Sequence, residues 1–252
     1  LLPQLAAGER MLALAHFEPG NRYALDQVTT TATANPTGWT LDGSKAVVLA
    51  APSADSLIVS ARDGLGFSLF LVDAKAPGIR QRSYATQDGA RAADIQLSAV
   101  QVGPDALLGP AGGALPLIER AVDQANAALC AEAVGIMAAL NEVTLEYLKT
   151  RKQFGVPIGK FQALQHRMAD MVIAIEQARS MAILAAVRAD DTDAGERRRA
   201  LSAAKAYVLQ SARLVGQQAR QPVGDLRGAL AVATYVAVGC PGAGHQPARR
   251  VE

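Results

Sequence analysis

The sequence predicts an α+β fold, in which an antiparallel β-barrel or sandwich is followed by an up-down α-helical bundle. Two observations predict it. Up to about residue 102, short apolar stretches alternate with Gly, Pro and Asp, which is typical of strands joined by turns. From residue 115 on, long alanine-rich segments repeat apolar residues at three- and four-residue steps, which is the period of a helix. The period changes at the Gly-rich segment 109–113, so we place a domain boundary there.

The strands of the β half are predicted from turn residues and from short apolar runs. Asn-Pro-Thr-Gly at 35–38 lies between two Thr-rich segments and predicts a hairpin. Apolar stretches at 46–50, 56–61 and 67–72 predict further strands, and residues 93–102 alternate apolar with polar positions. This pattern leaves the topology of the sheet open.

Three segments of the second half predict helices, at 115–150, 161–189 and 195–220. Their length and short connections favour an antiparallel bundle, and their alanine content indicates close helix packing. The second helix carries the clearest apolar stripe, formed by Met168, Met171, Ile175, Ala178 and Ala182.

The predicted domains are a β-domain at residues 1–110, a helical bundle at 111–220 and a divergent, poorly ordered tail at 221–252. A net charge of +2 and an aromatic content of 4% offer no surface typical of nucleic-acid binding. Cys130 and Cys240 match no metal-ligand spacing, so we expect no metal site and a reducing, cytoplasmic location. No apolar run is expected to be long enough to span a membrane.

The segment 151–158, Arg-Lys-Gln-Phe-Gly-Val-Pro-Ile, admits two interpretations. As a helix end, its cations complement the helix dipole, Gly155 ends the helix and Pro157 prevents its return. As an anion site, Arg151 can fork onto a pyrophosphate while Phe154 offers an apolar face to a nucleotide ring. The residues by themselves favour the helix end and leave the anion site as the alternative.

Several motifs, in the same order and spacing, resemble one known family. Residues 151–162, followed by Met-Ala-Asp-Met at 168–171, resemble the C-terminal signature of acyl-CoA dehydrogenases. Phe-Glu-Pro-Gly at 17–20 is similar to the family's Thr-Glu-Pro-Gly loop, and residues 38–45 are similar to its Gly-Tyr-x-Leu-Asn-Gly-x-Lys hairpin. The resemblance covers about residues 3–220 and is strongest to the small subunits of pimeloyl-CoA dehydrogenase-type members.

The resemblance implies a middle β-domain and a C-terminal helical bundle, and we expect the family's N-terminal helical domain to be missing. It also implies FAD as cofactor, an acyl-CoA substrate, an electron-transfer flavoprotein as acceptor, a homo- or hetero-oligomer and a place in fatty acid metabolism. The cofactor-binding positions that it carries over are Arg151, Gln153, Phe154, Gln162, Gln221 and Gly224. The substrate-binding positions are Glu18, Pro19, Gly20 and Asp123. Arg151 and Phe154 are expected to hold the FAD of a neighbouring subunit.

The residues expected around the flavin depart from the family pattern. Phe17 and Leu49 replace threonines whose hydroxyl groups can hydrogen-bond the polar edge of a flavin. Asp225 adds a negative charge where the family has a glycine close to a phosphate. An unpaired buried polar group costs about 1–3 kcal/mol, so we expect weakened flavin binding.

A catalytic base is not evident in this sequence. Ala125 falls at one family position of the catalytic glutamate, and residues 221–252 contain no match to the other position. We interpret Glu132 as a polar group within the bundle and His16 as a packed residue. No catalytic residue is therefore assigned.

Four functional hypotheses remain. The chain is an FAD-linked acyl-CoA dehydrogenase-like oxidoreductase, weak or inactive by itself, because both base positions have lost their glutamate. Alternatively, it is a non-catalytic subunit that completes the FAD site of a complete homologue. The third hypothesis is a truncated remnant with little function of its own, and the last is a binding module unrelated to flavin.

Overall fold

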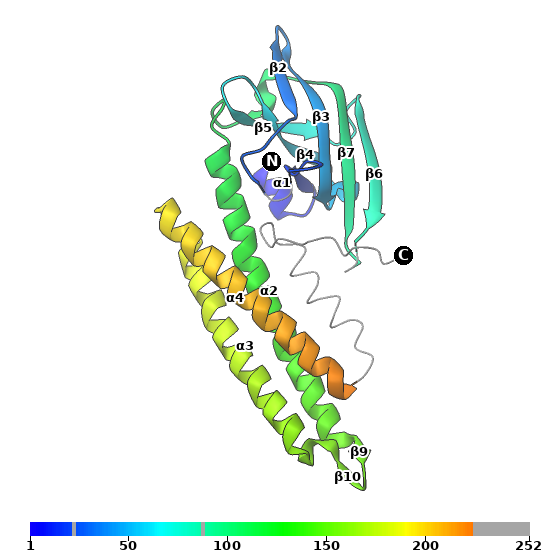
Figure 1. Cartoon of the computed structure of the whole chain (residues 1–252). Coiled ribbons are helices and arrows are strands. Elements are labelled where there is room, and N and C mark those ends of the chain that lie inside the picture. The colour runs from blue at the N-terminus through cyan, green and yellow to red at the C-terminus, as the bar shows by residue number, and fades with distance from the viewer. Residues whose placement is uncertain (22–23, 87–88, 224–252) are drawn as a thin grey trace. The chain divides into compact units, whose positions relative to one another are not determined.

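The computed structural model describes residues 1–21, 24–86 and 89–223 of the chain (Figure 1). The fold consists of two compact units, one from Leu1 to Glu119 and one from Arg120 onward. The first unit is built from strands and the second from helices.

The first unit is organised around one eight-stranded sheet, counted over the described residues. The strands are β1 (Leu12–Ala15), β2 (Thr31–Asn35), β3 (Gly38–Leu49), β4 (Ser56–Arg62), β5 (Phe67–Asp73), β6 (Ile79–Ala85), β7 (Arg91–Val102) and β8 (Leu107–Leu108). Their order across the sheet is β6-β7-β3-β2-β4-β5-β8, with β1 paired to β4. β4 runs parallel to β1 and β2, and the other pairings are antiparallel.

The core of this unit lies under the alternating apolar positions of the central strands. Leu57 and Val59 of β4, Phe70 of β5 and Ile95 of β7 are at most 1% exposed. A short helix, α1 (Leu2–Ala6), precedes β1. Two helical turns connect strands, namely η1 (Ala51–Ser53) between β3 and β4 and η2 (Pro104–Ala106) between β7 and β8. The predicted mostly antiparallel β fold is confirmed, and the two parallel pairings of β4 supply the topology that the sequence pattern left open.

The predicted hairpin at residues 35–38 joins β2 to β3, with Asn35 paired to Gly38. The Asn35 side chain accepts a hydrogen bond from the backbone N–H of Thr37 at 2.9 Å, which closes the turn. Gly38 has φ +140°, and a Cβ at this position would lie 2.1 Å from the carbonyl oxygen of Val102. Only glycine therefore lets β3 approach the end of β7 this closely.

The second unit contains three long helices in the described residues, α2 (Leu115–Thr150, which begins in the first unit), α3 (Gln162–Arg188) and α4 (Ala194–Val223). A small hairpin, β9 (Lys152–Gln153) and β10 (Val156–Pro157), and the turn η3 (Ile158–Lys160) connect α2 to α3. The predicted stripe of α3 packs on α2 and α4 around Met137, Ile175 and Val208. The helical bundle predicted after the β-domain is thus confirmed.

The expectation that no segment is long enough to cross a membrane was wrong for α2. Judged by length and composition alone, this one helix among the described residues is apolar enough to do so, and 28% of its most apolar window is buried. The core helix of a folded domain passes the same test. The division into residues 1–110, 111–220 and 221–252 stays a prediction, and most of the predicted tail lies outside the described residues.

Replacing Gly38 with alanine is predicted to destabilise the β unit by about 2–3 kcal/mol, because the added Cβ meets a backbone carbonyl. The matched control is Gly135→Ala in α2, where a Cβ meets nothing within 4 Å. This change should stabilise its helix by about 0.5–1 kcal/mol. Calorimetric unfolding of the two variants measures both effects, and an equal effect in both would contradict the packing at Gly38.

Candidate functional site

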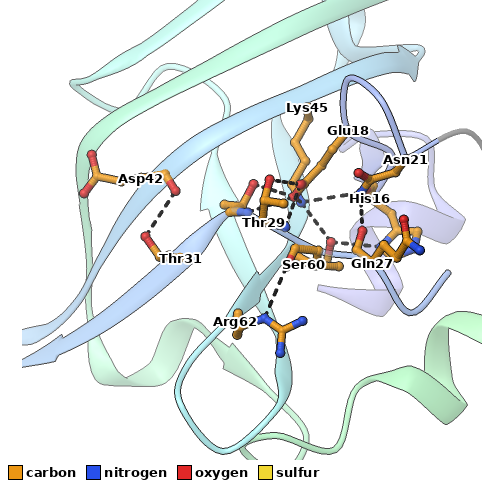
Figure 2. A network of polar contacts seen from close by, with 12 residues as sticks. His16, Glu18, Asn21, Gln27, Thr29, Thr31, Asp42, Lys45, Ser60 and Arg62 are labelled. Carbon is orange, nitrogen blue, oxygen red and sulfur yellow. Dashed lines mark hydrogen bonds and ion pairs between the residues drawn. The ribbon is translucent and has the colours of Figure 1, made fainter. Parts of the chain in front are cut away.

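A buried ion pair ties the Phe-Glu-Pro-Gly segment to β3 (Figure 2). Lys45 Nζ lies 2.7 Å from Glu18 Oε1, and the two side chains are 0% and 1% exposed. Removing two charges from water is costly unless every remaining hydrogen-bonding group finds a partner. The surroundings of both residues meet that condition.

The carboxylate of Glu18 accepts hydrogen bonds from both neighbouring threonines as well as from Lys45. Thr29 donates through its backbone N–H at 2.7 Å and through its hydroxyl group. Thr30 donates through its backbone N–H at 3.0 Å and its hydroxyl at 2.6 Å. Burial raises the pKa of Glu18, but the hydrogen bonds from Lys45, Thr29 and Thr30 outweigh it and lower the pKa to about 2. The carboxylate is therefore ionised, and both of its oxygens accept hydrogen bonds from within the fold.

His16 and Ser60 extend this network into the core. Lys45 Nζ donates to Ser60 Oγ at 3.0 Å, and His16 Nδ1 lies 2.9 Å from the same Oγ. Burial and the charge of Lys45 lower the pKa of His16 to about 4, so the ring is neutral at pH 7. Since Lys45 can only donate, Ser60 accepts from it and donates its own proton to His16. His16 is thus a packed residue.

An open groove of about 860 Å³ lies beside this network on the outer face of β3, β7 and β6. Pro19 and the backbone around Lys45 form one side of the groove, and Val47 projects at its edge with 51% of its surface exposed. The polar residues of the wall are Ser44, Arg80, Gln81, Arg82, Ser83, Tyr84, Asp94 and Gln96. An apolar patch between hydrogen-bond donors is the composition expected for a cofactor or substrate surface.

The hairpin between α2 and α3 presents Phe154 to solvent, with 91% of its surface exposed. Phe154 and Gly155 form a two-residue turn in which both have positive φ, 54° and 79°, as in a type I′ turn. A bulky residue is strained in this conformation, and Asn would be the usual choice. The ring makes an edge contact with Phe161, at 6.2 Å between centroids. An exposed aromatic ring in a strained turn is accessible to a ligand, and the cofactor-binding role of Phe154 stays a prediction.

The remaining predicted cofactor residues lie near this hairpin or beyond the described side chains. Arg151, Gln153 and Gln162 are exposed at the junctions of α2, the hairpin and α3. Gln221 belongs to α4, where its side chain is not described, and Gly224 lies outside the described residues. In the second unit, the structure therefore brings Arg151, Phe154 and the start of α3 together.

The predicted substrate residues separate into three surroundings. Pro19 lines the groove, and Gly20 is exposed beside it. Glu18 faces the buried network, so its carboxylate has no surface left for a substrate. Asp123, on α2, forms an ion pair of 2.8 Å with Arg197 of α4. Substrate binding by these residues stays a prediction, and the contacts of Glu18 and Asp123 give both carboxylates a use within the fold.

The structure supplies no evident base at the positions considered. Ala125 is exposed on α2. Glu132 is also exposed, so its interpretation as a polar group within the bundle was wrong. Among the residues that the structure describes, no group of three or more His, Cys, Asp or Glu could hold a metal ion.

The sequence interpretation missed Lys45, Ser60 and Asp94 as parts of the site. Lys45 was visible as the last residue of the hairpin motif at 38–45, but its partner Glu18 lies 27 positions away. Ser60 and Asp94 carried no signal, because their role depends on strand pairings that the sequence pattern did not specify.

The β unit should lose stability between pH 7 and pH 5 because of His16. An unfolded His titrates at 6.5 and the folded one at about 4, so the unfolded chain binds the extra proton and stability falls as pH drops through this window. The expected loss is about 2 kcal/mol at pH 5. Lys45, with its pKa lowered by burial to about 8, and Glu18, at about 2, keep their charge over this range.

Urea unfolding of the wild-type chain and of the His16→Gln variant at both pH values measures this effect. The variant should show the smaller dependence on pH, because its side chain does not titrate. Equal dependences in the two proteins would contradict a neutral, buried His16.

Two family models match the chain in succession. The model described as acyl-CoA dehydrogenase, middle domain, matches residues 13–101, and that described as acyl-CoA dehydrogenase, C-terminal domain, matches residues 114–230. Together they cover both units of the structure. The fold of each unit and the order of the motifs thus agree with these two domain matches.

Similar proteins include the mitochondrial short-chain specific acyl-CoA dehydrogenase of Bos taurus, 29% identical over 87% of this chain and 55% of that protein. The 3-(aryl)acrylate reductase of Clostridium sporogenes is 30% identical over 84% of this chain and 58% of its own length. The chain therefore spans little more than half the length of these curated relatives.

Among solved structures, PigA with FAD and proline superposes with a TM-score of 0.89 at 25% identity, covering 96% of this chain and 67% of PigA. The glutaryl-coenzyme A dehydrogenase complex with glutaryl-CoA superposes with a TM-score of 0.86 at 22% identity over 95% of this chain and 66% of that one, which shows a shared fold. The chain therefore belongs to the acyl-CoA dehydrogenase family of FAD-dependent oxidoreductases, of which it carries the middle and C-terminal domains.

Proposed function

We propose that the chain is an FAD-linked acyl-CoA dehydrogenase-like oxidoreductase that is weak or inactive by itself in the α,β-dehydrogenation of an acyl-CoA thioester. The observation that carries the proposal is Phe154, exposed over 91% of its surface in a turn that strains it. Apart from its edge contact with Phe161, the ring faces solvent. The family relationship supplies the ligand that such a ring would contact.

The described residues fit FAD on two separate surfaces. In the second unit, Arg151 offers a guanidinium to a pyrophosphate and Phe154 a face to an adenine ring. In the first unit, Val47 and Leu49, 51% and 48% exposed, offer apolar contact to a flavin ring next to the polar groove wall. FAD, when bound, supplies the acceptor for the substrate's hydride. The chain's own residues bind and orient it.

At the α2 position where the family resemblance places the catalytic glutamate, this chain has Ala125, so the expected residue for proton transfer is missing there. α,β-Dehydrogenation requires a base that removes the proton on Cα before or as the hydride leaves Cβ. Ala125 has no group that can accept a proton. Weak or absent turnover by the isolated chain follows from this.

A second function, a non-catalytic subunit of a heteromeric acyl-CoA dehydrogenase, is favoured by the combination of Ala125 with the intact hairpin. Arg151 and Phe154 could then complete the FAD site of a partner that carries its own base. The proposed assembly is accordingly a homo- or hetero-oligomer with another acyl-CoA dehydrogenase subunit. We further propose acyl-CoA as substrate, an electron-transfer flavoprotein as acceptor and the cytoplasm as location.

The Phe154→Asn variant separates ligand binding from folding. Asn tolerates positive φ, and Asn-Gly is favoured in type I′ turns, so the unfolding temperature should stay equal or rise. FAD affinity, measured by fluorescence titration of the reconstituted chain, should fall about tenfold, a loss of about 1.4 kcal/mol. Arg151→Gln should weaken binding similarly.

The matched control is Lys152→Ala, an exposed cation on the same hairpin. Its FAD affinity should stay within about twofold of that of the wild-type chain, which corresponds to about 0.4 kcal/mol. Unchanged affinity in both Phe154→Asn and Arg151→Gln would overturn the proposed use of the hairpin.

Restoring a carboxylate at position 125 tests the account of the missing base. The Ala125→Glu variant, loaded with FAD, should bleach its flavin absorbance with butyryl-CoA under anaerobic conditions at least about 100-fold faster than the unmodified chain, the typical contribution of a general base. Ala131→Glu, exposed on another face of α2, is the control and should change nothing. Rapid bleaching by the unmodified chain would show that a base exists elsewhere.

A further inference from the structure

A β-bulge in β3 places Val47 at the edge of the groove. Lys45 pairs with Ile95 and Val48 with Ala93, so two residues of β3 lie opposite Asp94 alone. The carboxylate of Asp94 accepts a hydrogen bond from the backbone N–H of Val47 at 3.1 Å. Val47 has φ 53°, a conformation that a β-branched residue adopts only under constraint.

A second bulge in the same pair of strands is built in the same way, with the strands exchanged. Leu41 pairs with Val100 and Gly43 with Leu97, so Asp42 of β3 lies opposite two residues of β7. The Asp42 carboxylate accepts a hydrogen bond from the backbone N–H of Ala99 at 2.7 Å, and Ala99 has φ 49°. Each aspartate therefore holds a residue of the facing strand in the left-handed region.

The two bulges differ in their surroundings. Asp94 lines the groove and also accepts hydrogen bonds from Arg82 at 2.6 Å and from the Tyr84 hydroxyl at 3.0 Å. The hydrogen bond from Arg82 lowers the pKa of Asp94, which keeps its carboxylate ionised at neutral pH. Neither Asp42 nor Ala99 lines the groove. The bulge at the groove thus has two extra supports on its aspartate.

The hydrogen bonds from Arg82 and Tyr84 to Asp94 lie where they can fix the backbone of β3 at the edge of the groove. Left-handed φ is unfavourable in a non-glycine residue and persists only when neighbouring contacts over-determine it. At Val47 those contacts come from the Asp94 carboxylate, which Arg82 and Tyr84 orient. Loss of Asp94 would let this segment of β3 relax towards a conformation that valine prefers.

We propose that Asp94 is a positioning residue for the flavin, which acts by holding the strained bulge at Ala46–Val47 in the conformation that presents β3 to the ring. The proposal rests on the proposed function, since it assigns the groove edge to FAD. Asp94 acts through the backbone of Val47, and Arg82 and Tyr84 act through Asp94. The Asp42–Ala99 bulge serves the fold alone.

The test is FAD titration and thermal unfolding of five variants beside the wild-type chain. Asp94→Ala removes the acceptor, and Asp94→Asn keeps an oxygen that can accept from Val47. Val47→Gly and the double variant Asp94→Ala/Val47→Gly place a residue at 47 that adopts positive φ freely. Asp42→Ala is the matched control at the other bulge.

We expect Asp94→Ala to weaken FAD binding about tenfold. The affinity of Asp94→Asn should return to within about threefold of that of the wild-type chain. The double variant should bind FAD within about threefold of the affinity of Val47→Gly. Asp42→Ala should lower the unfolding temperature and leave FAD affinity within about twofold. If Asp94→Ala and Asp42→Ala affect affinity equally, or if glycine at 47 gives no recovery, the positioning role is overturned while the proposed function stands. A wild-type chain that binds no FAD overturns both.

Discussion

The buried pair of Lys45 and Glu18 constrains the rest of the β unit. Lys45 and Val48 are three positions apart on β3, yet both are 1% exposed, although regular alternation would place them on opposite faces. The bulge between them adds one residue to β3. Because of this extra residue, the side chains of Lys45 and Val48 both point into the core. The outward side of the same bulge is the exposed Val47 at the groove. One internal ion pair thus accounts for the shape of an outer surface.

The pair also holds the loop that carries Pro19. Glu18 is bound to Thr29 and Thr30 at the far end of that loop as well as to Lys45, so both ends of the loop meet at one carboxylate. Removing one partner of a buried pair costs about 3–5 kcal/mol, because it leaves the other charge without compensation. Replacing Lys45 by a neutral residue would therefore disturb the loop and the groove together. The Glu-Pro-Gly segment at 18–20 therefore has a structural role through Glu18.

Much of the fold could be predicted from local pattern, and much of the site could not. The 3.6-residue period predicted α2 with the bounds that the structure shows, and the stripe from Met171 to Ala182 is buried as predicted. The turn at 35–38 was predicted from its residue types. By contrast, positive φ at Val47 and Phe154 opposes the preferences of both residues, so no propensity could have predicted it. The use of Glu18 depended on pairings between distant strands, and the exposure of Glu132 depended on helix packing.

Each of the two candidate FAD surfaces carries an apolar residue with positive φ, Val47 in the first unit and Phe154 in the second. Each also has a charged group close by in its own unit, Asp94 and Arg151 respectively. Hydrogen–deuterium exchange of the whole chain, with and without FAD, tests most directly whether both surfaces bind the cofactor. Two segments should exchange more slowly with FAD present, residues 45–50 around the bulge and residues 151–158 around the hairpin. Protection confined to other segments, or no protection at all, would contradict the assignment of FAD to these surfaces.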